Sequence, residues 1–314
     1  MGATKEQTLA AINLLGAAED DTFSTHPNKT KRIEAIKKGY DRAQNQQNNI
    51  STLPKKDISE SEENLLNESY ILFEIKGDKL GAIEKTNQII QMNPKSFKAF
   101  FSRGFIKSST ENYVGALNDY NQALILNPDL NIAYRWRAQA KFELGDTRGS
   151  IQDFNYAINN STDDLDKIYS NRGMVKKAIG DFEGALADYS SAIKLNPKND
   201  DTYFKRGSIK SKLNDFRGAI IDCNEALAIN PKNLGALDCR AVVKYSLGDY
   251  KGGISDLDRV IELDTNPQSL AHSYYTRGAL KMLSKNRYGG CSDFKKSCEL
   301  GNSGACNHYN AECR

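Results

Sequence analysis

The feature that most constrains this chain is an internal repeat of about 34 residues. Asn-Pro pairs recur at 93–94, 127–128, 196–197 and 230–231, which are 34, 69 and 34 residues apart. Glycines recur with nearly the same period, at positions 81, 115, 149, 184, 218, 252 and 289. A period near 34 is typical of stacked helix–turn–helix units. One such unit cannot bury its apolar face alone, so the units stack and present an extended surface. The pattern therefore favours binding over catalysis.

The composition of the 314 residues is consistent with a thin, two-layer array. Hydrophobic residues make up 39% of the chain, which is low for one large core. The net charge is only +3 and does not indicate a nucleic-acid partner. There is no apolar run near 18 residues, so we expect no insertion into a membrane. A charged and then apolar leader is also missing, so no signal peptide is predicted.

The repeat divides the chain into regions. Residues 1–44 are predicted to form two short helices, and the polar, proline-containing segment 45–62 is predicted to be a linker. The repeats occupy 63–304, and residues 291–314 form a cysteine-rich cap that overlaps the last repeat. We place the seven units at 63–96, 97–130, 131–165, 166–199, 200–233, 234–270 and 271–304.

The unit at 200–233 shows the expected layout. Helix A is predicted from about Asp201 to Leu213 and helix B from about Arg217 to Ile229, with a turn at Asn214-Asp215. Asn230-Pro231 ends helix B, because proline cannot continue a helix and asparagine tolerates the cap conformation. Small residues recur at one phase of each helix, where close approach is expected: Gly104, Ala138, Gly173, Gly207, Ala241 and Gly278 on helix A, and Ala82, Ala116, Ala185 and Ala219 on helix B.

This pattern resembles the tetratricopeptide repeat (TPR) family over about residues 63–304. The small, aromatic and proline positions of the motif are matched in two units by Gly104, Ala116, Tyr120, Ala123 and Pro128, and by Gly173, Ala185, Tyr189, Ala192 and Pro197. The resemblance implies an all-α fold, a right-handed superhelical solenoid of about seven helix hairpins behind a short helical N-terminal extension. One departure is systematic, because lysine replaces the tyrosine common in the middle of helix A.

The resemblance also implies that the inner faces of the A helices line a concave groove for a protein or peptide ligand. Aromatic, methionine and arginine side chains are typical of such binding surfaces. Mapped onto this chain, the groove residues are Phe101, Phe105, Arg135, Gln139, Phe142, Lys167, Met174, Lys177, Phe204, Ser208, Tyr245 and Tyr275. Some of these side chains would instead pack against the next repeat. The Lys/Asn set with which some relatives hold a peptide carboxylate has no match here.

Charged residues also follow the repeat. Helix A carries Arg103, Arg137, Arg172, Arg206, Arg240 and Arg277, each four residues before a lysine, and helix B carries Asp119, Asp153, Asp188, Asp222, Asp256 and Asp293. An arginine and a lysine at this spacing share one helical face. They would form either a cationic track for a polyanion or an Arg–Asp pair within each repeat. The arginines and the aspartates recur at matching positions of the repeat, which favours the Arg–Asp pair.

Four of the six cysteines, Cys291, Cys298, Cys306 and Cys313, are spaced 7, 8 and 7 residues apart near the C-terminus. In an antiparallel hairpin the residue numbers of facing positions add up to a constant. Cys298 with Cys306 and Cys291 with Cys313 give the same sum, which favours these two bridges. The segment CELGNSGAC also resembles cysteine-rich relatives of the TPR. A zinc site and four reduced thiols remain as alternatives. Cys223 and Cys239 are predicted to be small buried hydrophobic residues.

The N-terminal segment holds a second resemblance. MGATKEQTLAAINLLG and FSTHPNKTKRIEAIKKGY are similar to the region after the catalytic core of zinc metallopeptidases, some of which carry TPRs downstream. No H-E-x-x-H is present, and His26, His272 and His308 are the chain's three histidines. We therefore expect no catalytic residues, no metal and no cofactor.

The sequence leads to three functional hypotheses. The first is a non-catalytic protein- or peptide-binding scaffold, and the second is the TPR-containing tail of a metallopeptidase-like protein that lacks its catalytic part. The third is polyanion binding along the Arg/Lys positions, which steep salt dependence would reveal. A bridged cap favours an extracytoplasmic (periplasmic) location if the chain belongs to a longer precursor. A cytoplasmic location is expected if the chain is complete as given. The partner and the oligomeric state stay open.

Overall fold

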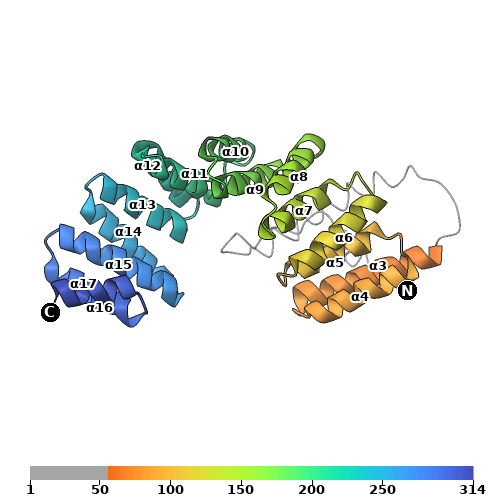
Figure 1. Cartoon of the computed structure of the whole chain (residues 1–314), viewed down its shortest axis with the longest axis horizontal. Helices are drawn as coiled ribbons and strands as arrows, with labels where there is room; N and C mark the ends of the chain where they lie inside the picture. Colours follow the sequence, from red (N-terminus) through yellow and green to blue (C-terminus); the bar gives the residue numbers. More distant parts are fainter. Residues whose placement is uncertain (1–55, 314) are drawn as a thin grey trace. The chain divides into compact units, whose positions relative to one another are not determined.

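The computed structural model describes residues 56–313, and all regular structure within them is helical (Figure 1). This part of the chain contains fifteen α-helices and one short π-helical segment, η1. In order they are α3 (Lys56–Tyr70), η1 (Ile71–Ile75), α4 (Lys79–Met92), α5 (Phe97–Ser108), α6 (Tyr113–Leu126), α7 (Asn131–Glu143), α8 (Thr147–Asn160), α9 (Leu165–Ala178), α10 (Phe182–Leu195), α11 (Asp200–Lys212), α12 (Phe216–Ile229), α13 (Leu234–Ser246), α14 (Tyr250–Leu263), α15 (Pro267–Leu283), α16 (Arg287–Glu299) and α17 (Ser303–Glu312).

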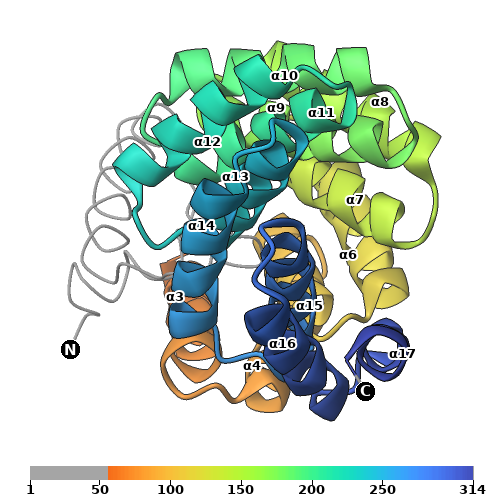
Figure 2. The same cartoon turned by 90° about the vertical axis from the view of Figure 1, so that its left-hand side faces the viewer.

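The helices form two compact units, the first ending at Val175 and the second beginning at Lys176, inside α9. In the first unit α3 packs on α4, α5 on α6 and α7 on α8, and each hairpin packs on the next. The second unit repeats this arrangement with α11 on α12, α13 on α14 and α15 on α16 (Figure 2). Helix α17 then packs on α16. The predicted all-α stack of helix hairpins is confirmed.

Helix α3 begins at Lys56, within the segment that the sequence assigned to the linker. Glu62 connects this helix to the segment between α4 and α5, because its carboxylate accepts hydrogen bonds from Asn93 Nδ2 at 2.8 Å and from Ser96 Oγ at 2.5 Å. A polar residue that composition alone assigns to a linker thus binds the N-cap residue of α5.

Each helix B starts with an aspartate or asparagine cap. In α12, the Asp215 carboxylate accepts a hydrogen bond from the backbone N–H of Gly218 at 2.9 Å. The same bond recurs in Asp78–Gly81, Asn112–Gly115, Asp146–Gly149, Asp181–Gly184, Asp249–Gly252 and Asn286–Gly289. Such caps satisfy an N–H group that has no partner inside the helix. The periodic glycines of the sequence are therefore the third residues of the B helices.

The turn between helices A and B requires one residue with a left-handed backbone. Gly145, Gly180 and Gly248 hold this position at φ between 79° and 85°, whereas Glu111 and Lys285 adopt φ of 61° and 63° there. The asparagines of the Asn-Pro pairs differ, because they end the B helices in extended conformations with φ between −142° and −131°. The following proline disfavours helical geometry at these asparagines. Their side-chain oxygens accept the N–H two residues later instead.

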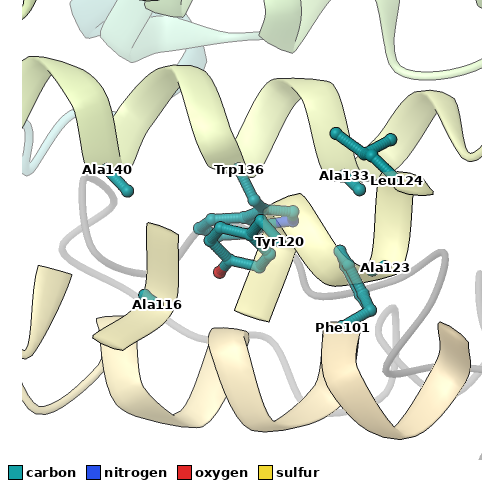
Figure 3. Close-up of a cluster of buried hydrophobic side chains, with 8 residues drawn as sticks. All are labelled: Phe101, Ala116, Tyr120, Ala123, Leu124, Ala133, Trp136 and Ala140. Carbon is teal, nitrogen blue, oxygen red and sulfur yellow. The ribbon is translucent and has the colours of Figure 1, made fainter. Parts of the chain in front are cut away.

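Small and aromatic residues fill the space between the helices. In the first unit one buried cluster contains Phe101, Ala116, Tyr120, Ala123, Leu124, Ala133, Trp136 and Ala140 (Figure 3). A Cβ added at Gly104 would lie 2.9 Å from the Tyr120 ring. The small residue in the middle of helix A is therefore required by the aromatic ring that helix B places against it.

Two disulfides close the C-terminal end of the second unit. Cys291 on α16 is bonded to Cys313 with a Cα–Cα distance of 5.5 Å, and Cys298 is bonded to Cys306 on α17 with a distance of 4.7 Å. Ser297 adds a hydrogen bond of 2.6 Å from its Oγ to the Ala271 carbonyl on α15. The final helix is thereby attached to the last repeat with the pairing expected from the hairpin.

Candidate peptide-binding surface

Charged side chains connect helices A and B inside each repeat. In the hairpin of α11 and α12, Arg206 donates from Nε and Nη2 to the two carboxylate oxygens of Asp222, at 2.9 and 2.7 Å. Lys210 reaches the same carboxylate at 2.8 Å. Asp222 is only 1% exposed. The hydrogen bond with Asp222 raises the pKa of Arg206. These three side chains form one rung of a ladder.

The remaining guanidinium nitrogen of each arginine extends to the previous repeat. Nη1 of Arg206 donates to Ser190 Oγ at 3.2 Å. In other repeats the acceptor is an asparagine or an aspartate, in the pairs Arg103–Asn87, Arg137–Asn121, Arg172–Asn155, Arg240–Asn224 and Arg277–Asp258. Arg103, Arg137, Arg206, Arg240 and Arg277 thus each join two consecutive B helices. The sequence interpretation missed this contact although residues 87, 121, 155, 190, 224 and 258 follow the same period.

The ladder has a structural role. The arginine and lysine side chains of its complete rungs are between 15% and 23% exposed, and each rung shares one buried carboxylate. A polyanion that captured these cations would leave that carboxylate without compensation, which is strongly unfavourable. The geometry therefore favours the internal pair over a cationic track.

In the first unit three aromatic rings pack together around Phe105, one of the predicted groove residues. Phe105 is half-buried between two edge-to-face partners, Phe73 at 5.6 Å and Trp136 at 4.9 Å between ring centroids. Sequence reasoning missed both partners, although Trp136 is the chain's one tryptophan and follows Arg135 directly. An aromatic pair of this geometry contributes about 0.5–1.5 kcal/mol beyond the area that it buries.

Polar side chains of the predicted set meet at Asp164. Arg135 Nη1 lies 3.8 Å from one of its carboxylate oxygens, and Lys167 Nζ lies 3.3 Å from the other. The guanidinium of Arg135 also lies over the Trp136 ring at 5.1 Å. The structure therefore brings Arg135, Lys167 and the aromatic group together through an aspartate that the sequence did not single out.

Four other residues predicted for the groove lie in this unit and are described by their own contacts. Gln139 is buried and donates from Nε2 to Glu143 Oε1 at 2.6 Å. Phe101 is 0% exposed and packs with Tyr120 at 5.8 Å between centroids, so it is a core residue here. Phe142 packs on the cluster around Phe154, and Met174 is half-buried.

The predicted residues of the second unit are dispersed over several A helices. Phe204 on α11 is half-buried and so close to α13 that a Cβ at Gly235 would lie 2.8 Å from its ring. Tyr275 on α15 packs at the cap, with its ring 5.7 Å from that of His308. Tyr245 on α13 is 49% exposed, and Ser208 is half-buried.

Two ionisable groups of the second unit are held in unusual surroundings. Burial lowers the pKa of Lys177, and the nearby positive charges of Lys212 and Lys205 lower it further. Burial likewise raises the pKa of Asp238 on α13. Of its two carboxylate oxygens, Oδ1 is buried without a hydrogen-bond partner. A ligand group that neutralised either side chain would reduce the cost of burying it. Asp238 was missed because a single aspartate carries no periodic signal.

Within residues 56–313 no three His, Cys, Asp or Glu side chains are grouped so that they could hold a metal ion. None of the helices described there is long and apolar enough to cross a membrane. The segment with similarity to metallopeptidases, and with it the predicted region 1–44, lies outside the described residues.

Comparisons with known proteins point to one repeat family. A family model described as TPR repeat matches residues 173–214, and one described as tetratricopeptide repeat matches residues 200–233. Neither model describes a catalytic family. A search of curated proteins gives no match.

Several solved structures are similar over most of the chain. One is a tetratricopeptide repeat protein from Parabacteroides merdae, with a TM-score of 0.60 and 19% identity over 81% of this chain and 99% of that one. Another is the C-terminal part of a TPR repeat-containing protein from Cytophaga hutchinsonii, with a TM-score of 0.59, 16% identity and coverage of 76% and 97%. Pseudomonas aeruginosa pilF has a TM-score of 0.61, 15% identity and coverage of 70% and 98%. At these identities the similarity establishes the fold alone.

Proposed function

Because the chain is a tetratricopeptide repeat protein, we propose that it is a non-catalytic scaffold that binds a protein or peptide along the inner faces of its A helices. Stacked repeats of this kind build extended surfaces that suit such ligands. The specific ligand surface consists of the half-buried and exposed members of the A-helix set inferred from the sequence, now extended by Phe73 and Asp238. The buried members Phe101, Arg135 and Gln139, together with Trp136, would support this surface and not contact the ligand directly.

The aromatic group around Phe105 carries this proposal. Phe73, Phe105 and Trp136 form a continuous edge-to-face series, and Arg135 lies over the last ring. Aromatic residues and arginine are enriched among the residues that contribute most to the binding energy of protein interfaces. A ligand with an apolar side chain fits the half-buried rings of Phe73 and Phe105 in this group.

The other two hypotheses have less support. Polyanion binding would require the ladder cations to leave their buried carboxylates. The metallopeptidase-tail hypothesis depends on residues 1–44 and on chain outside the given sequence, and the scaffold proposal is compatible with it. An adjoining coding segment that contained H-E-x-x-H would establish that relationship.

The binding surface can be tested with two exposed tyrosines. Tyr245 lies on helix A of its repeat and is 49% exposed, whereas Tyr288 lies on a B helix and is 89% exposed. The intact chain would first be used to select ligands from a library of random peptides. We expect Tyr245→Ala to weaken binding of the selected peptides by roughly tenfold, which corresponds to about 1.4 kcal/mol. Tyr288→Ala is the matched control and should bind like the wild type. Loss of binding in Tyr288→Ala with normal binding in Tyr245→Ala would contradict the proposed surface.

A further inference from the structure

Two cysteines outside the cap face each other in the second unit. Cys223 on α12 and Cys239 on α13 are both free thiols, and their Sγ atoms lie 2.9 Å apart. The sulfurs of a disulfide are about 2.05 Å apart, so a displacement of less than about 1 Å would allow a bond. We propose that this pair is a redox-sensitive modification site, where a disulfide forms between two consecutive repeats.

The position of the pair in the repeat supports this assignment. Helix B holds Tyr120, Phe154, Tyr189, Leu257 and Phe294 where it holds Cys223. The equivalent interface in the first unit is filled by the rings of Tyr120 and Trp136, which belong to one buried cluster (Figure 3). In the second unit Cys223 and Cys239 instead pack with Ala219 and Val243. A large side chain thus occupies the position of Cys223 in the other repeats, whereas the position of Cys239 varies and holds Ser102, Trp136, Asn171, Lys205 or Thr276.

The two thiols differ in access. Cys223 is 0% exposed, while Cys239 is 8% exposed and lies close enough to Lys177 for an electrostatic interaction. The hydrogen bond with Cys239 raises the pKa of Cys223, and burial raises it further. Cys239 is the more exposed of the two, so it is the sulfur that meets an oxidant first. Cys223 then resolves the intermediate from inside the core.

The oxidant is a disulfide, either of a small thiol or of an oxidoreductase. The Cys239 thiolate attacks one oxidant sulfur, forms a mixed disulfide and releases the other sulfur as a thiolate. Cys223 loses its proton and attacks Sγ of Cys239, which displaces the second thiolate. Two electrons thus pass to the oxidant, and the two cysteine protons end on the two released thiols. The conditions that maintain the cap disulfides supply this class of oxidant.

The bond would join helix B of one repeat to helix A of the next. These residues are 16 positions apart, so the closed loop is short. Cross-linking removes conformations from the unfolded chain and so favours the folded state. It also prevents α12 and α13 from separating. The stability of this interface, and of the A-helix surface that it supports, would therefore depend on the redox conditions.

The test uses the intact chain with its cap disulfides formed, incubated with oxidised glutathione. Free thiols are then alkylated in denaturant, and the peptides are mapped without reduction. We expect a Cys223–Cys239 cross-link, a fall from two alkylated cysteines to none, and a higher melting temperature. Two alkylated cysteines with intact cap bridges would overturn the proposal, as would a glutathione adduct on Cys239 that never resolves.

Matched variants separate the cross-link from other effects of oxidation. Cys223→Ala with Cys239→Ala should lose the oxidant-dependent shift in melting temperature while its cap disulfides form normally. Cys223→Ala alone should stop at the mixed disulfide on Cys239. If a variant fails to fold, the peptide map of the wild-type chain still decides the question. An oxidant-dependent shift that persists in the double variant would contradict the assignment.

Discussion

The carboxylate of Asp215 covers Gly218 so closely that a Cβ at residue 218 would lie 2.1 Å from Oδ2. Asp215 is the cap of α12 and accepts the Gly218 N–H at 2.9 Å. The same relationship recurs in Asp146–Gly149, Asp181–Gly184 and Asp249–Gly252, again with 2.1 Å to the added Cβ. The periodic glycine is thus coupled to the periodic cap, because a larger residue would displace the capping group.

This coupling predicts that the effect of Gly218→Ala on the free energy of unfolding changes sign when the Asp215 cap is removed. Gly218→Ala should destabilise the wild-type chain by about 1 kcal/mol, since the carboxylate must leave its capping position. In the background of Asp215→Ala, the same change should stabilise by up to about 1 kcal/mol, because alanine is the better helix former. Chemical denaturation of the four variants measures both values. Equal effects of Gly218→Ala in the two backgrounds would show that cap and glycine are independent.

The charge ladder predicts a large cost for removing one arginine. Arg206→Ala leaves Asp222 buried with Lys210 as its remaining ion-pair partner, so we expect a loss of about 3 kcal/mol in the free energy of unfolding. Lys198→Ala is the control, because Lys198 is exposed and should change stability little. Thermal denaturation compares the two. Equal melting temperatures would mean that the ladder adds no stability.

The turn between α15 and α16 predicts a stabilising substitution. Lys285 has φ of 63°, a left-handed conformation that costs an L-residue about 1 kcal/mol or more. Lys285→Gly should therefore increase stability by about 1 kcal/mol. Gly248→Ala at the equivalent turn, where φ is 79°, should have the opposite effect. If both substitutions destabilise, the left-handed residue is not a source of strain in these turns.

The two cap disulfides should contribute unequally. Cys291–Cys313 spans 22 residues and Cys298–Cys306 spans 8. The loop-entropy model gives about 2.5 kcal/mol for the shorter loop and about 0.9 kcal/mol more for the longer one. Paired Cys→Ala variants of each bridge, compared under oxidising conditions, test this order. A greater loss from removing Cys298–Cys306 would show that native contacts in α17 outweigh loop length.

Much of this architecture could be predicted because the repeat is local. The 34-residue period and the Asn-Pro pairs located the helix boundaries, and the matched phases of Arg206 and Asp222 indicated their pairing before any distance was known. The cap disulfides followed from the geometry of one tight hairpin. In each case the partners lie on adjacent helices, where chain connectivity leaves few alternatives.

The phase of a helix also limits what sequence can tell about individual side chains. Phe101 and Phe105 are one helical turn apart and both were assigned to the groove, yet Phe101 is 0% exposed and Phe105 is half-buried between two rings. The exposed fraction depends on the neighbouring helix, which the local pattern does not describe. The predicted groove therefore contains core residues as well as surface residues.

The sequence by itself determined the helical repeat and its paired charges, because these depend on spacings within about one repeat. Only the tertiary structure placed Asp164 between Arg135 and Lys167, gave the Asn-Pro asparagines an extended backbone, and brought Cys223 to 2.9 Å from Cys239. These features depend on the exact rotation and separation of packed helices. Side-chain volumes fix that packing collectively, and no single motif in the chain encodes it.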